Sequence, residues 1–321
     1  MAEYKGIKGF NIQTVSSDPP APFTGEVWYN STSATVKYLG IQAAAWASGG
    51  NLGTARYKLA GAGTQTAGLA FGGSTPFSNA TEEYNGSAWT GGGNLTTARS
   101  GLAGNGTQTA GLAFGGVSGP GAPGFSTATE EYGGSSWTNG GNMGTARNDL
   151  AGCGTQTAGL AFGGFLAPPV PTSQTNLTEE YNGTAWTNGG NLSAVKEQLA
   201  GAGTQTAGLA FGGNPGPSTE TEEYNGTAWT NGGNLGTGRY KLAGAGTQTA
   251  ALAFGGTGDT DGTEQYNGTA WTATANMATG RVFLAGAGYQ TAGLAFGGDP
   301  STAVTEEFNG ETPATFTVGT D

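Results

Sequence analysis

The sequence predicts an all-β fold: a six-bladed β-propeller of four-stranded blades, preceded by a short N-terminal module of extended chain and a β-hairpin. Three observations predict this fold. A unit recurs six times from Trp46 onward, one spacing inside the unit is constant, and turn residues divide each unit into four short apolar or aromatic runs. A period of about 40–50 residues with four short strands is typical of one propeller blade.

Three aromatic positions define the repeated unit. A tryptophan, expected to lie in the core, is found at Trp46, Trp89, Trp137, Trp186, Trp229 and Trp271. A phenylalanine precedes a Gly-Gly pair at Phe71, Phe114, Phe162, Phe211, Phe254 and Phe296. A third aromatic follows an acidic pair, whose second member is replaced once by Gln265, at Tyr84, Tyr132, Tyr181, Tyr224, Tyr266 and Phe308. Each Trp lies 25 residues before the next Phe, whereas the step from Phe to the following Trp varies between 17 and 24 residues. The variation in length is therefore confined to one loop of each unit.

Turn residues place the four strands of the first unit. We expect the first two strands at residues 59–63 and 67–71, joined by a Gly-Thr-Gln turn. A third strand is expected at 81–84 and a fourth around Trp89, with Asn85-Gly86 supplying the positive φ angles of a tight hairpin. The first two strands consist mostly of Ala and Gly because small side chains fit where inner strands converge on a propeller axis, while aromatic residues fill the wider space between blades.

The order of the units predicts how the ring closes. Six first strands are present, but only five have a fourth-strand tryptophan downstream. We therefore expect the strand around Trp46 to complete the last blade and remove an exposed edge, with residues 315–318 as the rival strand. This reasoning divides the chain into residues 1–45, an attachment or oligomerisation module with a β-hairpin, and residues 46–321, the propeller.

Composition and charge limit the partners. Glycine accounts for 64 of 321 residues, a content close to that of disordered chains, but the recurring aromatic residues argue for a folded core. A net charge of −11 does not fit a nucleic-acid partner. Cys153 is the single cysteine and is expected to be a buried structural thiol. The N-terminal residues resemble neither a signal peptide nor a membrane span, so we expect synthesis in the cytoplasm and no membrane insertion.

The sequence lacks the side chains of the common catalytic sites. It contains no histidine and one cysteine, which disfavours zinc and iron sites and excludes Ser-His-Asp and Cys-His arrangements. The adjacent Glu82 and Glu83 point to opposite faces of a strand, so they cannot act as the carboxylate pair of a glycosidase. We therefore predict no enzymatic activity, no catalytic residues, no metal and no cofactor.

One basic residue per unit follows the tryptophan by ten positions. This repeat cation ring consists of Arg56, Arg99, Arg147, Lys196, Arg239 and Arg281. A glutamate recurs with it at Glu82, Glu130, Glu179, Glu222, Glu264 and Glu306. The cations could bind an anion such as phosphate or an acidic glycan at one mouth of the propeller. The alternative, which we favour, is structural: each cation pairs with a glutamate and satisfies loop carbonyl groups.

The loops between the second and third strands differ from unit to unit. They cover residues 74–80, 117–128, 165–177, 214–220, 257–262 and 299–304, and they share a face with the connections that carry the cations. Binding residues concentrate on loops of a rigid scaffold. Candidate contacts with a ligand are Phe77, Phe125, Phe165 and Leu166, which can also simply pack onto the scaffold.

The repeated unit resembles the kelch repeat in its Gly-Gly pair, the aromatic after an acidic residue, the later Trp and the terminal Arg. The resemblance covers residues 46–310, although Asn-Gly stands where kelch repeats often have Tyr-Asp. It implies a propeller. Some kelch propellers are copper-radical sugar oxidases, but that metal site cannot be assembled without histidine.

A second resemblance concerns the N-terminal segment. Residues 17–20 (Ser-Asp-Pro-Pro), 25–32 (Gly-Glu-Val-Trp-Tyr-Asn-Ser-Thr) and 35–40 (Thr-Val-Lys-Tyr-Leu-Gly) are similar to short modules of tailed-bacteriophage structural proteins, including tail fibres. The resemblance implies a virion structural protein whose residues 1–45 contact other virion proteins through Trp28, Tyr29 and Tyr38, and whose loops bind a host-surface glycan or protein. A homo-oligomer is compatible with this reading. The alternative is a non-viral kelch-type lectin or protein-interaction module, with the N-terminal segment as an additional hairpin.

Overall fold

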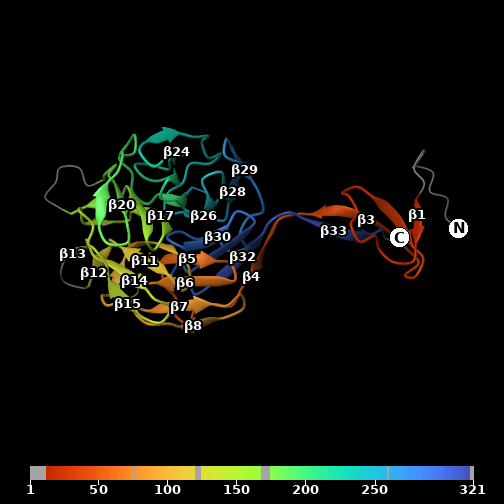
Figure 1. Cartoon of the computed structure of the whole chain (residues 1–321), viewed down its shortest axis with the longest axis horizontal. Helices are drawn as coiled ribbons and strands as arrows, with labels where there is room; N and C mark the ends of the chain where they lie inside the picture. The colour runs from red at the N-terminus through yellow and green to blue at the C-terminus, as the bar shows by residue number, and fades with distance from the viewer. Residues whose placement is uncertain (1–11, 75–76, 120–123, 168–173, 259, 319–321) are drawn as a thin grey trace. The chain divides into compact units, whose positions relative to one another are not determined.

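A computed structural model describes residues 12–74, 77–119, 124–167, 174–258 and 260–318 (Figure 1). Every regular element within these ranges is a β-strand. The chain forms two compact units, Met1–Ala44 with Gly310–Asp321, and Ala45–Asn309. The last residues thus group with the N-terminal segment, whereas the sequence-based division assigned them to the repeats.

The larger unit contains six four-stranded antiparallel sheets, which are consistent with the blades of a propeller. Each sheet has the small Ala/Gly strand first, and the chain passes from one sheet to the next in sequence order (Figure 1). The sheets, in strand order, are β5-β6-β7-β8 (Ala60–Thr64, Ala67–Phe71, Thr81–Tyr84, Trp89–Gly91), β10-β11-β14-β15 (Ala103–Gly106, Gly111–Phe114, Thr129–Tyr132, Trp137–Asn139), β17-β18-β20-β21 (Ala151–Thr155, Ala158–Phe162, Thr178–Tyr181, Trp186–Asn188), β22-β23-β24-β25 (Ala200–Thr204, Ala207–Phe211, Thr221–Tyr224, Trp229–Asn231), β26-β27-β28-β29 (Ala243–Thr247, Ala250–Phe254, Thr263–Tyr266, Trp271–Ala273) and β30-β31-β32-β4 (Ala285–Tyr289, Ala292–Phe296, Thr305–Asn309, Ala45–Ser48).

The strand positions agree closely with the sequence prediction. Strands β6 and β7 have the predicted bounds, and β5 begins one residue later than expected. The hairpin between β7 and β8 differs in one respect, because only Gly86 has a positive φ (+89°). Asn85 instead uses its side-chain oxygen, which accepts hydrogen bonds from the backbone N–H groups of Ser87 and Ala88. The asparagine therefore stabilises the turn through its side chain and not through an unusual backbone angle.

The strand around Trp46 completes a sheet with the last repeat. Strand β4 pairs with β32 and places Trp46 opposite Phe308. The rival prediction is wrong: β33 (Thr312–Thr317) pairs with β3 (Thr35–Gln42) in the smaller unit. The hydrophobic residues of β33 therefore belong to the sheet of the smaller unit and not to the repeats.

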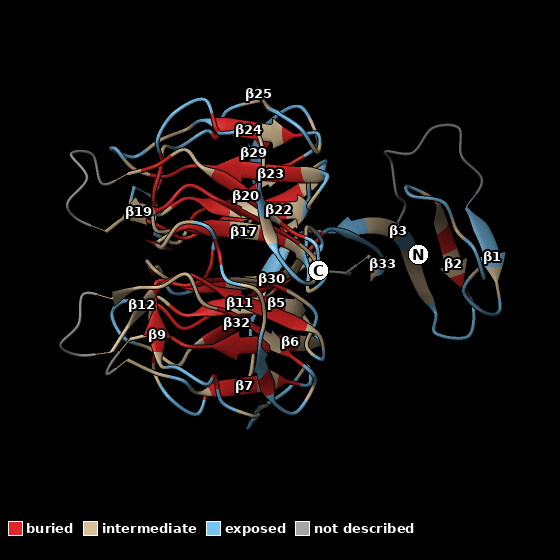
Figure 2. Cartoon of the chain, turned by 60° about the vertical axis from the view of Figure 1, so that its left-hand side comes forward, coloured by how far each residue is buried: buried red, intermediate tan, exposed pale blue. Residues whose placement is uncertain are grey.

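Aromatic contacts join neighbouring sheets in the same way at every interface. Each repeat tryptophan donates its indole N–H to the threonine hydroxyl that begins the third strand of the preceding sheet, at 2.9–3.0 Å. Its ring also packs against the phenylalanine of that sheet, with centroids 4.9–5.2 Å apart. Trp46 makes both contacts, with Thr263 and Phe254. Figure 2 shows the buried residues along the strands of the larger unit, for example β7, β17 and β23, whereas exposed residues lie mainly in the connections.

A second interface contact joins tyrosine and glutamate. The hydroxyl groups of Tyr84, Tyr132, Tyr181, Tyr224 and Tyr266 each donate a hydrogen bond to a glutamate of the preceding sheet. At the remaining interface both partners differ, because Phe308 replaces the tyrosine and Gln265 replaces the glutamate. Loss of the hydroxyl would leave a carboxylate without its donor, so the two changes compensate each other.

Alkaline pH is expected to weaken the fold through these five tyrosines. Burial, and next the neighbouring glutamate, raises the pKa of each to about 12. A tyrosine in the unfolded chain has a pKa of about 10, so this stabilisation is complete below about pH 10 and is lost as the pH rises towards 12. The midpoint of guanidinium unfolding should therefore fall across this range, less steeply in Tyr84→Phe. Ionisation of all eleven tyrosines near pH 10, seen as the full tyrosinate absorbance while the protein stays folded, would contradict this expectation.

The smaller unit is a four-stranded sheet in the order β1-β2-β3-β33, with β1 at Gln13–Val15 and β2 at Val27–Asn30. The predicted hairpin is confirmed as the antiparallel pair β2 and β3. Trp28 was predicted as a docking residue, but it is fully buried and donates its indole N–H to Asp18. Its role is thus in the core of the unit. Tyr29 is half-buried, and the exposed Tyr38 stacks on Phe316.

Candidate functional site

The variable loops and the connections that carry the cations lie side by side. Short strands or single bridges join the residue after each cation to the residue after each Gly-Gly pair. Strand β9 (Arg99–Ser100) pairs with β12 (Val117–Ser118), which also pairs with β13 (Gly124–Phe125). Strand β16 (Arg147–Asn148) pairs with β19 (Phe165–Leu166). The single bridges include Tyr57–Ser74, Glu197–Asn214, Tyr240–Thr257 and Val282–Asp299. Each variable loop is thereby anchored to the connection of its own repeat.

The arginines of the repeat cation ring are buried inside this face. Arg56 donates from Nη1 to the carbonyl groups of Gly72 and Ala80 at 2.8 and 2.9 Å, and from Nη2 to Glu82 at 2.7 Å. The equivalent ion pairs are Arg99–Glu130, Arg147–Glu179, Arg239–Glu264 and Arg281–Glu306. All five guanidinium groups are fully or almost fully buried. This geometry fits the structural interpretation and leaves the arginines inaccessible to a ligand.

Lys196 is the exception in this ring. Its ammonium group pairs with Glu220, whose side chain is 58% exposed, and not with the buried Glu222. Glu222 accepts a hydrogen bond from the backbone N–H of Ser193 at Oε2, while its Oε1 is buried and has no hydrogen-bond partner among the described residues. Lysine lacks the fork of donors with which arginine reaches carbonyl and carboxylate oxygens together.

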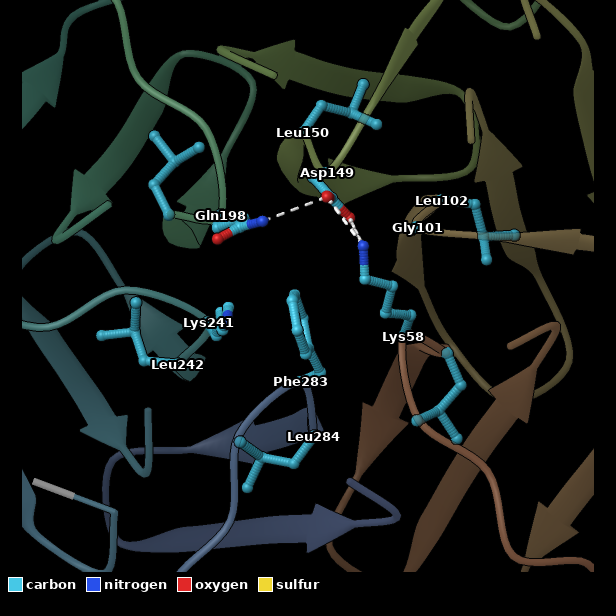
Figure 3. Close-up of a pocket in the computed structure, with 12 residues that line it drawn as sticks. Lys58, Gly101, Leu102, Asp149, Leu150, Gln198, Lys241, Leu242, Phe283 and Leu284 are labelled. Carbon is cyan, nitrogen blue, oxygen red and sulfur yellow. Dashed lines mark hydrogen bonds and ion pairs between the residues drawn. The ribbon is translucent and has the colours of Figure 1, made fainter. Parts of the chain in front are cut away.

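A ring of six residues lies inside the cation ring and surrounds a pocket of about 80 Å³ (Figure 3). These axial residues occupy the second position after each cation. They are Lys58, Gly101, Asp149, Gln198, Lys241 and Phe283. The backbone N–H of each donates to the carbonyl of its counterpart in the preceding repeat at 2.8–2.9 Å, and Lys58 donates to Phe283. Six hydrogen bonds thus return to their starting residue.

The axial residues have an unusual backbone conformation. Their φ angles lie between +49° and +63°, the left-handed region that favours glycine, yet only Gly101 is a glycine. Holding another residue there costs about 1–3 kcal/mol. Ala34 is the one further described residue, apart from glycine, with a positive φ. Backbone strain in the described part of the chain is therefore concentrated around this pocket.

The axial side chains interact with one another across the pocket. Lys58 forms an ion pair with Asp149 at 2.9 Å, and Gln198 donates its amide N–H to the same carboxylate at 3.2 Å. Phe283 lies between Lys58 and Lys241 in Figure 3, with the two ammonium groups 4.5 and 4.7 Å from its ring centroid. Lys241 also lies 5.1 Å from the ring centroid of Tyr240. The pocket combines two cations, one anion, an amide and aromatic rings.

The predicted loop contacts are only partly brought together. Phe125 and Phe165, from adjacent repeats, stack with centroids 6.2 Å apart, and both are half-buried. Phe77 and Leu166 are also half-buried. None of the four is among the residues that line the axial pocket. Residues 75–76, 120–123, 168–173 and 259 of the variable loops lie outside the described residues.

The sequence prediction missed the axial residues. The two positions between each cation and the following leucine hold five different residue pairs in the six repeats, with Tyr-Lys occurring twice, while the flanking cation and leucine are nearly constant. Side-chain variation inside an otherwise uniform repeat is therefore visible in the sequence and indicates the pocket. The length variation of the loops is the more obvious signal, but it points to a different part of the same face.

Other candidate chemistry is limited. Cys153 is buried, as expected, and burial raises the pKa of its thiol to about 12. Glu82 and Glu83 have separate partners, Arg56 and Tyr132. Within the described ranges, no three His, Cys, Asp or Glu side chains are grouped so that they could hold a metal ion. The same ranges contain no helix that is long and apolar enough to cross a membrane.

Comparison with known proteins adds no relative. The sequence matches no protein-family model, and no curated protein is significantly similar to it.

Proposed function

We propose that this chain is a non-enzymatic structural protein of a phage virion, a tail fibre, decoration or receptor-binding component. Its larger unit is a closed six-bladed, kelch-like propeller that displays a recognition face. Its smaller unit attaches the protein to other virion proteins.

The closed propeller is supported by contacts that continue from the last repeat to the first. The axial hydrogen bonds include the one from Lys58 to Phe283, and Gln65 of the first repeat donates its amide N–H to the carbonyl groups of Gly293 and Phe308 of the last. Strand β5 contacts both β10 and β30. Full closure removes exposed strand edges, which otherwise favour aggregation.

The observation that carries the binding role is the location of the differences between repeats. The interface residues are almost identical in all six repeats, whereas the axial residues and the variable loops differ, and both belong to the same end of the sheets. A scaffold gains nothing from five different residue types at six equivalent positions. Such a pattern is typical of recognition, in which binding residues are presented by rigid elements.

The attachment role is supported by the smaller unit. It is compact in its own right and carries the sequence that resembles phage structural modules. Exposed apolar residues remain on it, with Phe23 70% and Ile41 47% exposed. These residues and Tyr38 are better candidates for contact with a virion partner than the buried Trp28.

Peptide mass spectrometry on density-purified phage particles from the source sample tests the virion role. We expect peptides from residues 25–37 and from the repeats to be present together in stoichiometric amounts. Their absence from particles, with abundant protein in cell or soluble fractions, would refute the virion role. The alternative function, a non-viral kelch-type lectin or protein-interaction module, rests on the same recognition face and would then take its place.

A further inference from the structure

The axial pocket contains side chains that the scaffold does not require. Its backbone hydrogen bonds are the same in all six repeats, and glycine would form them without strain. Gly101 shows that glycine is accepted at this position, in a chain that already contains 64 glycines. Five other residues are nevertheless retained in the left-handed conformation. Strain of this kind clusters at binding sites, where the side chain itself is needed.

The charge of the pocket favours an anion. Lys58 is neutralised by Asp149, whereas Lys241 forms no ion pair with any described residue, and its ammonium group lies over the rings of Tyr240 and Phe283. The pocket thus has one positive charge in excess, although the whole chain carries a net charge of −11. An incoming carboxylate would find the ammonium group of Lys241, which lies beside Phe283 and has no ion-pair partner among the described residues. Attraction of this kind is strengthened where solvent is partly excluded.

The remaining groups favour a sugar as the bearer of that carboxylate. Asp149 and Gln198 offer planar acceptors and donors that suit vicinal hydroxyl groups. The neighbouring rings of Tyr57 and Tyr240 are half-buried and offer aromatic surface for the C–H groups of a sugar. A pocket of about 80 Å³ is far smaller than the roughly 300–1,000 Å³ of a site that encloses a whole ligand, so it accepts one charged group at the end of a chain.

We propose that the axial pocket binds the terminal acidic sugar of a glycan. Lys241 binds the carboxylate, and Asp149, its ion-pair partner Lys58 and Gln198 bind hydroxyl groups. This inference rests on the proposed recognition role and specifies its ligand class.

Titration of the full-length protein with N-acetylneuraminate and with glucuronate, followed by saturation-transfer NMR, tests this inference. We expect at least one of the two to bind at least tenfold more tightly than glucose, and its affinity to decrease as ionic strength rises. Lys241→Gly should weaken this binding at least tenfold. Because residue 241 has a φ of +60°, the same variant should keep or raise Tm, which separates loss of binding from loss of fold.

Two matched variants control the experiment. Lys37→Met removes a lysine from the other unit and should leave binding unchanged. Ala34→Gly introduces glycine at the other strained position and should also leave binding unchanged.

Three results would overturn the inference: equal binding of glucose, unchanged binding by Lys241→Gly, or tighter binding of a short glutamate-containing peptide than of either acidic sugar. Particle association is a separate readout. If Lys241→Gly still binds host cells as part of the particle, the recognition role persists through the loops and the axial pocket alone is misassigned.

Discussion

Removing residues 1–50 is expected to lower Tm by about 6–20 °C. This truncation deletes β4, which pairs with β32, and with it the indole of Trp46 that packs on Phe254 and bonds to Thr263. Loss of a packed tryptophan costs about 3–5 kcal/mol, and each kcal/mol corresponds to about 2–4 °C in a domain of this size. The truncation also exposes an edge of β32, so aggregation on heating should increase.

The matched control removes only residues 1–44 and keeps β4. Both truncated proteins should also lack residues 310–321, because β33 loses its partner β3 in either case. The two proteins then differ only in residues 45–50, and their difference in Tm measured by circular dichroism reports on β4 alone. Equal melting temperatures would show that the Trp46 strand does not stabilise the last sheet.

The sequence predicted the strands well because each repeat confirms the others. Small residues, Gly-Gly pairs and Asn-Gly turns mark the same boundaries six times, so the bounds of β6 and β7 follow from the residues alone. The missing tryptophan pointed to the position of Trp46 in the same way. The six repeats can be compared with one another, much as related sequences are compared, to find which positions are constant.

Contacts between different repeats could not be read from the sequence. In the sequence, Phe308 and Gln265 are two unrelated exceptions to the repeat pattern. Only the structure shows that they belong to the same interface, where Phe308 replaces the tyrosine and Gln265 replaces the glutamate that would accept its hydrogen bond. The pairing of β33 with β3 was likewise hidden, because both segments alternate in polarity and many partners satisfy that pattern.

The axial pocket escapes sequence-based prediction for a different reason. Its residues are polar, charged or aromatic without any common motif, and their functional signal lies in a backbone angle that the sequence does not display. The cations stand out because they recur, but recurrence indicates a structural role here. Differences among equivalent positions, such as Lys58, Asp149 and Phe283, are the better guide to a binding site.

Breaking one buried ion pair is expected to be as damaging as removing β4. In Arg99→Met, the carboxylate of Glu130 loses its counterion while remaining buried, and the carbonyl groups of Gly115 and Ala128 each lose the hydrogen bond from the guanidinium group. Loss of one partner of a buried pair costs about 3–5 kcal/mol, which corresponds to about 6–20 °C in Tm. Calorimetry on the full chain measures this shift.

Removing the charge of the partner should recover part of the loss. In Arg99→Met with Glu130→Gln, the amide can still accept the hydrogen bond from the backbone N–H of Thr96, and no charge remains buried without a counterion. The double variant should therefore be more stable than Arg99→Met alone. If it is less stable, the damage comes from the lost carbonyl contacts and not from the unpaired carboxylate.

The repeat that contains Lys196 offers the converse experiment. In Lys196→Arg, the guanidinium group can reach the unpartnered Oε1 of Glu222, as Arg56 reaches Glu82. A hydrogen bond to a charged group contributes about 1.5–3 kcal/mol, and the exposed pair with Glu220 that is given up contributes little. We therefore expect a rise in Tm of about 3–12 °C. A fall in Tm would mean that the loop around Ser218 and Glu220, which contacts Lys196, fits a lysine and not an arginine. The fourth repeat would then differ from the others in more than one side chain.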